Sequence, residues 1–399
     1  MRFMFDNDEA FSFETLRAVG YTAYGGADIG EVMATAARIT PGDWESWHRE
    51  WLALADRIAT IADHSAADGH AASASSAYLR ASNYYRTAEF FLRDDPANDP
   101  RVDSTSARAI ETFRAAPEIQ AHWTRVGIPY QGIELEGYYL NAGGDEPGRT
   151  LLAHGGYDST VEELFFTAGE AARRRGWNCL IFEGPGQASA LRVNKLPFRH
   201  DWEAVVTPVV DFALSLPGVD PERIALLGMS MGGYLAPRAA AFEHRLAACV
   251  AYDGVIDMAV TILGRLGPQS PELDSKQTLA AMDHLIAHRA EAPSSLRWGI
   301  SNALWVFRGD TTQELLDEIS KYGDLTEVVG QITCPTLVCE AENDHFFSGQ
   351  PQMLYDALRC PKTLLTFTAA EGAAEHCHVG ALTLFHQRMF DWLDDTLGS

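Results

Sequence analysis

The sequence is poor in basic residues. Only 31 lysines and arginines stand against 55 aspartates and glutamates, so the 399-residue chain carries a formal net charge of −24. Phosphate backbones and anionic lipid headgroups repel such a chain unless it carries a strong local basic patch. The longest basic run is residues 173–175, which is typical of a solvated helix end favoured by the helix dipole. We therefore expect neither nucleic-acid nor membrane partners.

Cysteine is also scarce, and its spacing does not indicate a disulfide framework. None of the six cysteines forms a C-x-x-C pair, the spacing that redox and zinc motifs share. Several lie inside apolar runs, such as Cys179 in the segment NCLIF. We therefore expect reduced cysteines that pack as small buried hydrophobic side chains.

Long uncharged apolar runs are missing as well. No such run approaches the roughly 18 residues that span a bilayer, and acidic residues interrupt the N-terminus within a few positions. A cytoplasmic location is the expectation that follows. With 46% hydrophobic and 10% aromatic residues, the chain has ample material for a core, and the length allows two or three domains or one enlarged enzyme fold.

Residues 1–122 carry helical patterns, and we predict a helical cap region there. The clearest helix is expected to begin at Thr40, with Pro41 in the first turn and Asp43 completing a capping box. Apolar and aromatic residues then recur three and four positions apart, which favours core packing over a cofactor site. Two further helices are predicted at 71–92 and 107–122, separated by the Asp- and Pro-rich segment 93–106.

Residues 123–399 change to short apolar runs that alternate with helical segments. This alternation predicts an α/β fold with a mostly parallel sheet and helices on both faces. More than eighty residues separate Tyr252 from Thr336, which is too long for one crossover, so we expect a helical lid insertion at about 258–328. Strands are predicted at 128–130, 133–140, 150–153, 179–182, 224–227, 248–252, 336–339 and 363–367.

The strongest chemical motif is GMSMGG at residues 228–233. It lies between an apolar run and a helical run, the context that a G-x-S-x-G nucleophile elbow requires. Ser230 is therefore the predicted nucleophile, and the backbone N–H of Met231 is a predicted donor to the oxyanion.

A second motif, LLAHGGYD at residues 151–158, ends an earlier predicted strand. An HGG turn in this place can direct a second backbone N–H at the oxyanion, and we expect it to come from Gly156 or Tyr157. For His154 we favour a structural role, holding the loop by hydrogen bonds, over a role as base.

The acid and the base are expected after the last two strands. Glu342 and Asp344 are candidate acids, of which Asp344 is preferred, with Glu342 stabilising the loop. His376 is the preferred base because it lies in a loop, whereas His378 is expected in the first turn of the closing helix. The H-C-H run lacks further ligands at metal-site spacing, so no metal and no cofactor are predicted. The order of Ser230, Asp344 and His376 is that of α/β-hydrolases.

Taken together, these segments resemble one branch of the α/β-hydrolases. The similar segments are HGGYDSTVEELFF, FEGPGQ, GMSMGGYLAPR, AYDGVIDM, LVCEAENDHFF and EGAAEHCHVGA. The branch contains pseudooxynicotine hydrolases, fungal polyketide chain-shortening hydrolases and fermentation/respiration-switch-like esterases. The resemblance covers residues 125–399 strongly and the N-terminus in general character. One departure lies in FEGPGQASA, where Glu183 replaces a commoner Asp and Ala188 a usual Gly.

The resemblance implies a Ser230–His376–Asp344 triad under an N-terminal helical cap, which can also form a homodimer surface. Members of the branch cleave esters or carbon–carbon bonds next to a ketone through an acyl-enzyme. We therefore predict a serine hydrolase that acts on a bulky apolar or aromatic small molecule. Two other classes stay open, namely an acyltransferase or cyclase for a polyketide or peptide intermediate, and a non-catalytic binding protein. The predicted pocket residues are Trp298, Trp305 and Phe307, for which packing of the cap is an equal alternative.

Overall fold

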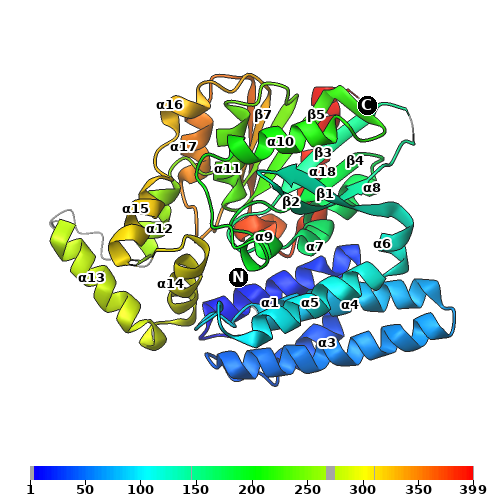
Figure 1. The fold of residues 1–399 in the computed structure, drawn as a ribbon, viewed down its shortest axis with the longest axis vertical. Helices are drawn as coiled ribbons and strands as arrows, with labels where there is room; N and C mark the ends of the chain where they lie inside the picture. Colours follow the sequence, from blue (N-terminus) through cyan, green and yellow to red (C-terminus); the bar gives the residue numbers. More distant parts are fainter. Residues whose placement is uncertain (1–3, 145, 267–274, 310, 399) are drawn as a thin grey trace. The chain divides into compact units, whose positions relative to one another are not determined.

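The computed structural model describes residues 4–144, 146–266, 275–309 and 311–398 (Figure 1). The chain forms two compact units. The first, which we call the helical unit, consists of Met1–Thr124 and Leu266–Trp305. The second, which we call the sheet unit, consists of Arg125–Arg265 and Val306–Ser399. The predicted insertion at 258–328 is thus divided between the units, and its residues 267–274 and 310 lie outside the described ranges. The roles of cap and lid stay predictions.

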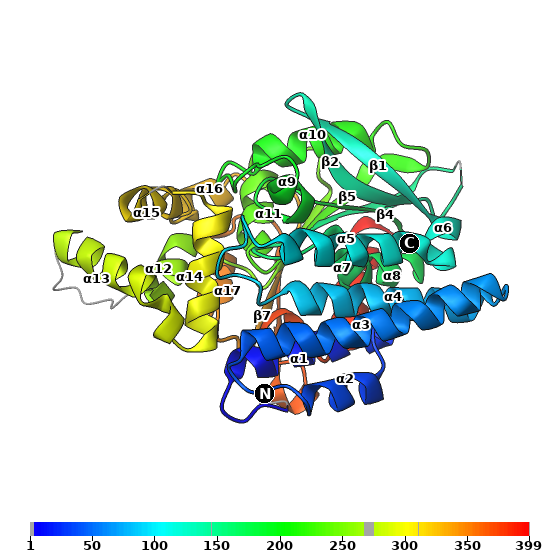
Figure 2. The same ribbon diagram turned by 60° about the horizontal axis from the view of Figure 1, so that its bottom comes forward.

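The helical unit is built around three helices that lie side by side, α3, α4 and α5 (Figure 2). Its aromatic residues form the core, because Trp47 and Trp51 are fully buried with ring centres 5.6 Å apart. The helices of this unit are α1 (Glu9–Gly20), η1 (Tyr21–Tyr24), α2 (Ile29–Ala36), α3 (Trp44–Ala67), α4 (Ala71–Glu89), α5 (Pro100–Ala115), α6 (Pro117–His122), α13 (Ser275–Ala287), η3 (Arg289–Glu291) and α14 (Ser294–Val306).

The start of α3 differs from the prediction. Asp43, and not Thr40, is the N-cap, because its carboxylate accepts the N–H of Ser46 at 3.0 Å. Gly42 precedes it with φ of 77°, a left-handed conformation that interrupts a helix. Thr40 instead donates its N–H to the Ser46 hydroxyl at 3.0 Å. The predicted capping box was therefore wrong by three residues.

The third predicted helix also begins earlier than expected. Asp99 caps α5 by accepting the N–H of Arg101 at 2.9 Å, and Pro100 occupies the first turn, where its missing N–H costs nothing. The backbone is extended at Ala116 before Pro117, which separates α5 from α6. An Asp- and Pro-rich segment that was predicted to be a loop thus starts a helix.

The sheet unit confirms the predicted mostly parallel sheet. In the described ranges the sheet has eight strands in the order β1-β2-β4-β3-β5-β6-β7-β8. β2 is antiparallel to β4, and the pairs from β4 to β8 are parallel. The strands are β1 (Trp123–Tyr130), β2 (Ile133–Leu140), β3 (Gly148–His154), β4 (Asn178–Phe182), β5 (Val219–Met229), β6 (Ala248–Tyr252), β7 (Thr336–Ala341) and β8 (Lys362–Phe367).

Helices cover both faces of this sheet (Figure 1). An ion pair between Arg238 and Glu203 at 3.0 Å joins α11 to α10. On another side, His386 of α18 bonds the carbonyl of Thr167 at 2.7 Å in a π-helical turn. The helices are α7 (Val161–Leu164), η2 (Phe165–Gly169), α8 (Glu170–Arg173), α9 (Ala188–Arg192), α10 (Glu203–Ala213), α11 (Gly232–Ala240), α12 (Met258–Leu266), α15 (Thr312–Ser320), α16 (Thr326–Val329), α17 (Gln350–Ala357), η4 (Ala369–Glu371), η5 (His376–His378) and α18 (Leu382–Leu397).

Three properties expected from composition can be compared with the structure. The described part of the chain has no helix that is long and apolar enough to cross a membrane. All six cysteines are free thiols, five of them buried and Cys360 partly exposed. In the basic run, Arg173 and Arg174 both pair with Glu170, at 2.6 and 2.8 Å, as side chains of a helix end.

Candidate active site

Three side chains from three loops meet at the carboxyl edge of the sheet. Ser230 follows β5, Asp344 follows β7 and His376 follows β8. His376 Nε2 lies 2.9 Å from Ser230 Oγ, and its Nδ1 lies 2.8 Å from Asp344 Oδ2. The structure thus brings together the three residues that the sequence singled out as nucleophile, acid and base.

The turn that carries Ser230 is tight and strained. Ser230 has φ of 62°, which L-residues rarely adopt and which costs conformational energy. The flanking glycines are needed for space: a Cβ on Gly228 would lie 2.1 Å from the carbonyl oxygen of Gly232. The N–H of Ser230 donates to the carbonyl of Tyr252 at 2.9 Å, so the end of β6 holds the turn. This is the geometry of a nucleophile elbow.

The HGG loop passes directly against the elbow. A Cβ on Gly156 would lie 2.7 Å from the backbone nitrogen of Met231 and 3.0 Å from the Cβ of Ser230. Only a glycine therefore allows this approach. The N–H of Gly156 donates to the hydroxyl of Ser159 at 3.3 Å, and Tyr157 is the next residue in the loop. The predicted oxyanion donors thus lie on two adjacent backbone segments.

Gln187 holds this loop, a role that the sequence did not indicate. Its side chain is 1% exposed and donates to the carbonyls of Gly155 and Gly156 at 2.8 and 3.1 Å. Its oxygen accepts the N–H of Gly184 at 2.8 Å. The available signal was its place in FEGPGQ, after the end of β4.

Glu183, the departure noted in the sequence, is fully buried and connects two helix starts. Its carboxylate accepts the N–H of Val161 at 2.9 Å and that of Ser189 at 2.7 Å. Burial raises the pKa of Glu183 above its ordinary value. The longer side chain therefore serves to position α7 and α9 behind the loop.

His154 lies in the core beneath the elbow. Its side chain is completely buried between the rings of Phe182 and Trp202, and Nδ1 lies 2.9 Å from the carbonyl of Gly155. Burial lowers the pKa of His154 to about 4, so the imidazole is neutral at pH 7. These contacts suit a residue that holds the loop.

The alternative acid and base lie elsewhere. Glu342 is exposed and accepts the N–H of Ala369 at 2.6 Å. His378 is fully buried, with Nδ1 3.2 Å from the carbonyl of Ala373 and its ring centre 4.0 Å from that of Phe367. Of the two histidines, His376 is thus the one that the structure brings to Ser230.

Asp253 is a further site residue that the sequence analysis missed. It follows β6, is 0% exposed, and its Oδ2 lies 3.0 Å from His376 Nδ1. The same oxygen accepts the N–H of Cys377. Its segment, AYDGVIDM, resembles the family, but an Asp-Gly pair after a strand is also typical of an ordinary turn.

The two carboxylates dominate the electrostatics of His376. Burial alone would lower the pKa of His376, but the charges of Asp344 and Asp253 outweigh it and raise the pKa well above its ordinary value. Burial would likewise raise the pKa of Asp344, but the contact with His376 and the N–H of Phe346 at 2.7 Å lower it. The site therefore stabilises a protonated imidazole.

The donor set does not suit a metal ion, although Asp253, His376 and Cys377 lie close together. Burial raises the pKa of Cys377 to about 12, so the thiolate that a metal would need is strongly disfavoured. His376 Nδ1 is already taken up by two carboxylates and its Nε2 by Ser230. We therefore assign no metal to these residues.

The predicted pocket residues belong to different units. Phe307 lies in the sheet unit, with its ring centre 6.0 Å from Tyr157 of the HGG loop and 5.7 Å from Phe198. Trp298 and Trp305 belong to the helical unit, where Trp298 stacks on Phe90 with ring centres 4.6 Å apart. Trp305 faces the Arg93 guanidinium, which lies 4.9 Å from the ring centre. Their part in substrate binding stays a prediction.

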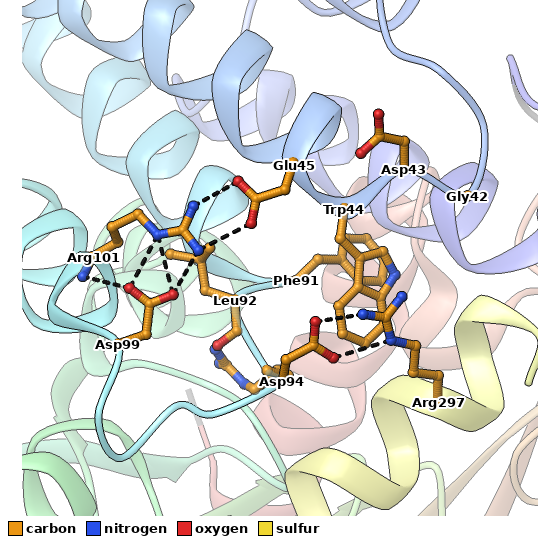
Figure 3. A pocket seen from close by; sticks show the side chains of 11 residues that line it. Gly42, Asp43, Trp44, Glu45, Phe91, Leu92, Asp94, Asp99, Arg101 and Arg297 are labelled. Atoms are coloured by element: carbon orange, nitrogen blue, oxygen red, sulfur yellow. Dashed lines mark hydrogen bonds and ion pairs between the residues drawn. The ribbon is translucent and has the colours of Figure 1, made fainter. Parts of the chain in front are cut away.

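A separate cleft within the helical unit is rich in charge (Figure 3). Arg101 pairs with Glu45 at 2.6 Å and with Asp99 at 2.7 Å. Arg297 pairs with Asp94 and stacks over the ring of Trp44 at 3.7 Å. Because these arginines are already paired with the acidic side chains beside them, the cleft is an ion-pair network and not a site for a charged ligand. The lining residues are Gly42, Asp43, Trp44, Glu45, Phe91, Leu92, Arg93, Asp94, Asp99, Arg101 and Arg297.

Comparison with known proteins identifies the class of enzyme. Residues 150–382 match the model of the alpha/beta hydrolase family. The chain therefore belongs to this family and is a hydrolase.

Similar proteins of known sequence match the chain over nearly its whole length. Hydrolase LUC6 from a Fusarium species is 33% identical over 97% of this chain and 96% of its own. The 20-hydroxy-prefusarin hydrolase FUS2 of Gibberella moniliformis is 35% identical with the same coverage of both chains. Among solved structures, the 2,6-dihydroxy-pseudo-oxynicotine hydrolase aligns with a TM-score of 0.75 and 23% identity over 95% of this chain and 96% of its own. That likeness shows the fold.

Proposed function

We propose that this hydrolase is a serine enzyme that cleaves an acyl bond through a covalent acyl-enzyme on Ser230. The observation that carries the proposal is the double contact of His376, whose Nε2 meets Ser230 Oγ at 2.9 Å while its Nδ1 meets Asp344 at 2.8 Å. A serine hydroxyl is a weak nucleophile until an adjacent base takes its proton, and the base works best when a carboxylate fixes its tautomer.

In the proposed reaction, His376 Nε2 removes the proton of Ser230 Oγ as the oxygen attacks the substrate carbonyl. The imidazolium then gives this proton to the departing oxygen, sulfur or carbon, so that the leaving group is released as an alcohol, a thiol or, when a bond next to a ketone breaks, a protonated carbon acid. Water, deprotonated by the same nitrogen, attacks the acyl-enzyme and releases the acid. The raised pKa of His376 supports the step in which the imidazole carries the extra proton.

For the oxyanion we propose the N–H of Met231 and a second N–H from the HGG loop, that of Gly156 or of Tyr157. The N–H of Gly156 donates to the hydroxyl of Ser159 at 3.3 Å. Each such donor contributes about 3 to 4 kcal/mol to the barrier reduction, because it meets charge that develops only in the transition state.

The proposed substrate is a bulky apolar or aromatic small molecule with a neutral or positive charge. Next to the oxyanion loop, the rings of Tyr157, Phe198, Phe307 and Tyr322 form a continuous cluster, with neighbouring ring centres 5.3–6.4 Å apart. The net charge of −24 disfavours a polyanion. The name of the relative FUS2, a 20-hydroxy-prefusarin hydrolase, also points to a small molecule.

A fluorophosphonate probe tests whether Ser230 is the nucleophile. The wild-type protein is expected to label at Ser230 and S230A to show no labelling. S301A, which removes another buried serine hydroxyl, should label like the wild type. A folded wild-type protein that does not react at Ser230 would contradict the proposal and favour a binding protein on a hydrolase scaffold.

Acyl transfer or cyclisation uses the same three residues, so the products must separate it from hydrolysis. A panel of short esters, acyl thioesters and β-diketones, each incubated with and without a competing alcohol or amine, gives this separation. Hydrolysis predicts free acid as the product in every incubation. Ester or amide products formed in preference to acid would favour the acyltransferase.

A further inference from the structure

We propose that Asp253 is a second acid of the active site, which positions His376 together with Asp344 and locks the loop of His376 to the nucleophile elbow. The inference rests on the proposed function, because it concerns the same base. It assigns a role to a buried carboxylate outside the expected group of three residues.

Two neighbouring residues at the end of β6 bind both the loop of His376 and the elbow. The N–H of Cys377 donates to Asp253 Oδ2, and the hydroxyl of Tyr252 donates to the carbonyl of Cys377 at 2.5 Å. Both backbone groups of the residue after His376 are therefore held from β6. The carbonyl of Tyr252 also accepts the N–H of Ser230 at 2.9 Å. The end of β6 thus fixes the positions of the nucleophile and the base relative to each other.

The backbone of Asp253 is itself held in a costly conformation. Its φ is 62°, a left-handed value, and its carbonyl packs so closely on Gly233 that a Cβ there would lie 2.2 Å away. Strain of this kind persists only where the surroundings over-determine it, and it concentrates at functional sites. The conformation turns the carboxylate toward His376 Nδ1, 3.0 Å away.

A second carboxylate also changes the charge around the base. With Asp344 at 2.8 Å and Asp253 at 3.0 Å, His376 Nδ1–H faces two acids that are 5% and 0% exposed. Each negative charge favours the imidazolium over the neutral imidazole and so raises the pKa of His376. The neutral imidazole is the form that removes the proton from serine. The groups that face His376 from other segments are Asp344 after β7, Asp253 after β6 and the Ser230 hydroxyl after β5. Cys377 and His378 face it from its own segment, and the charge of His345 acts on Asp344.

The test is the pH dependence of kcat/KM for D253N. Asparagine keeps the shape and can still accept the N–H of Cys377, but it removes one negative charge from the base. The acid limb of the profile, which reports deprotonation of His376, should move to lower pH by about 1 to 2 units. On the plateau, kcat should fall by about 10-fold or more because His376 is held less firmly.

Two control variants separate the effect of the charge of Asp253 from the effect of the hydrogen bonds that hold the loop of His376. Y252F removes the hydroxyl that holds the carbonyl of Cys377 and leaves all charges unchanged, so it should lower kcat without moving the acid limb. E243Q neutralises a buried carboxylate that pairs with Arg245 in another part of the sheet unit and should leave both quantities at wild-type values. A melting curve of each variant verifies the fold.

The outcomes distinguish this inference from the proposed function. If wild-type protein labels at Ser230 but folded D253N keeps the wild-type acid limb, the second-acid role is wrong and the proposed function stands. A D253N protein that does not fold is replaced by D253E, for which the retained charge predicts an unmoved acid limb and a lowered kcat. A limb that moves in D253E would contradict the charge argument. Failure of the wild type to label would refute the proposed function itself.

Discussion

Replacing Gln187 by leucine tests how the oxyanion loop is held. The side-chain amide makes three buried hydrogen bonds, and Q187L removes all of them at similar volume. The carbonyl of Gly155 keeps its contact with His154, whereas the N–H of Gly184 and the carbonyl of Gly156 lose their bond to Gln187. At about 1–3 kcal/mol for each buried group left without its partner, the free energy of unfolding should fall by about 2–6 kcal/mol.

The same change should slow acylation, because the loop carries an oxyanion donor. Displacing one donor costs about 100- to 1,000-fold in kcat, so a loosened loop should lower the rate by about 10- to 100-fold. The rate of Ser230 acylation by p-nitrophenyl acetate measures this step, and urea unfolding measures the stability. The change should fall on kcat more than on KM, because the lost interaction acts in the transition state.

Asn178 offers a matched control at the opposite end of β4. Its side-chain amide is 1% exposed, donates to the carbonyl of Gly218 at 2.6 Å and accepts the N–H of Ala142 at 2.9 Å. N178L should lower stability and leave acylation at the wild-type rate. If Q187L loses stability while acylating as fast as the wild type, Gln187 supports the fold alone and the reasoning on the loop is refuted.

Three further predictions concern single positions. A Cβ at Gly156 would lie 2.7 Å from the elbow backbone, so G156A should slow acylation by about 100-fold. G299A is the control and should have no effect, because a Cβ there meets nothing within 4 Å. Equal acylation rates for the two variants would contradict the close approach at Gly156. Because His154 has a pKa of about 4 when folded and about 6.5 when unfolded, the unfolded chain binds more protons between these values and stability falls as pH drops through this window. Urea unfolding of H154N should show a shallower fall, and an unchanged slope would count against a buried neutral imidazole. E89Q leaves the buried Arg93 without its counter-charge and should lower the free energy of unfolding by about 3–5 kcal/mol. E45Q removes one partner of an exposed pair and should lower it by less than about 1 kcal/mol. Similar shifts of the melting temperature in both variants would refute this contrast.

The sequence predicted the sheet well because several of its central strands are buried on both faces. All five residues of β4 and of β6 are buried, and such strands are short apolar runs that stand out between helices. The order of nucleophile, acid and base followed from the same pattern, since Ser230, Asp344 and His376 lie in the segments that follow β5, β7 and β8. These residues could be proposed because parallel strands bring their carboxyl ends to one edge of the sheet.

Asp253 could not be predicted in the same way, although it also follows a strand. The Asp-Gly pair is compatible with the left-handed φ of Asp253. The role of Asp253, however, depends on its distance to His376, which lies 123 positions away in the chain, and that distance has no sequence signature. Gln187 presents the same difficulty, because its partners are backbone carbonyls 31 and 32 residues away. At Asp43, two capping side chains three residues apart competed, and the conformation of Gly42 decided between them.

The helical unit is assembled from two distant pieces of chain, and this has a consequence for synthesis. Trp298 and Asn302, which hydrogen-bond the carbonyl of Phe90 and the guanidinium of Arg93, leave the ribosome about 200 residues after their partners. When the N-terminal helices emerge, part of their apolar surface is therefore still exposed, because the residues that cover it are translated much later. A nascent chain stopped before residue 266 should stay sensitive to protease in this region and bind chaperones that recognise exposed apolar surface.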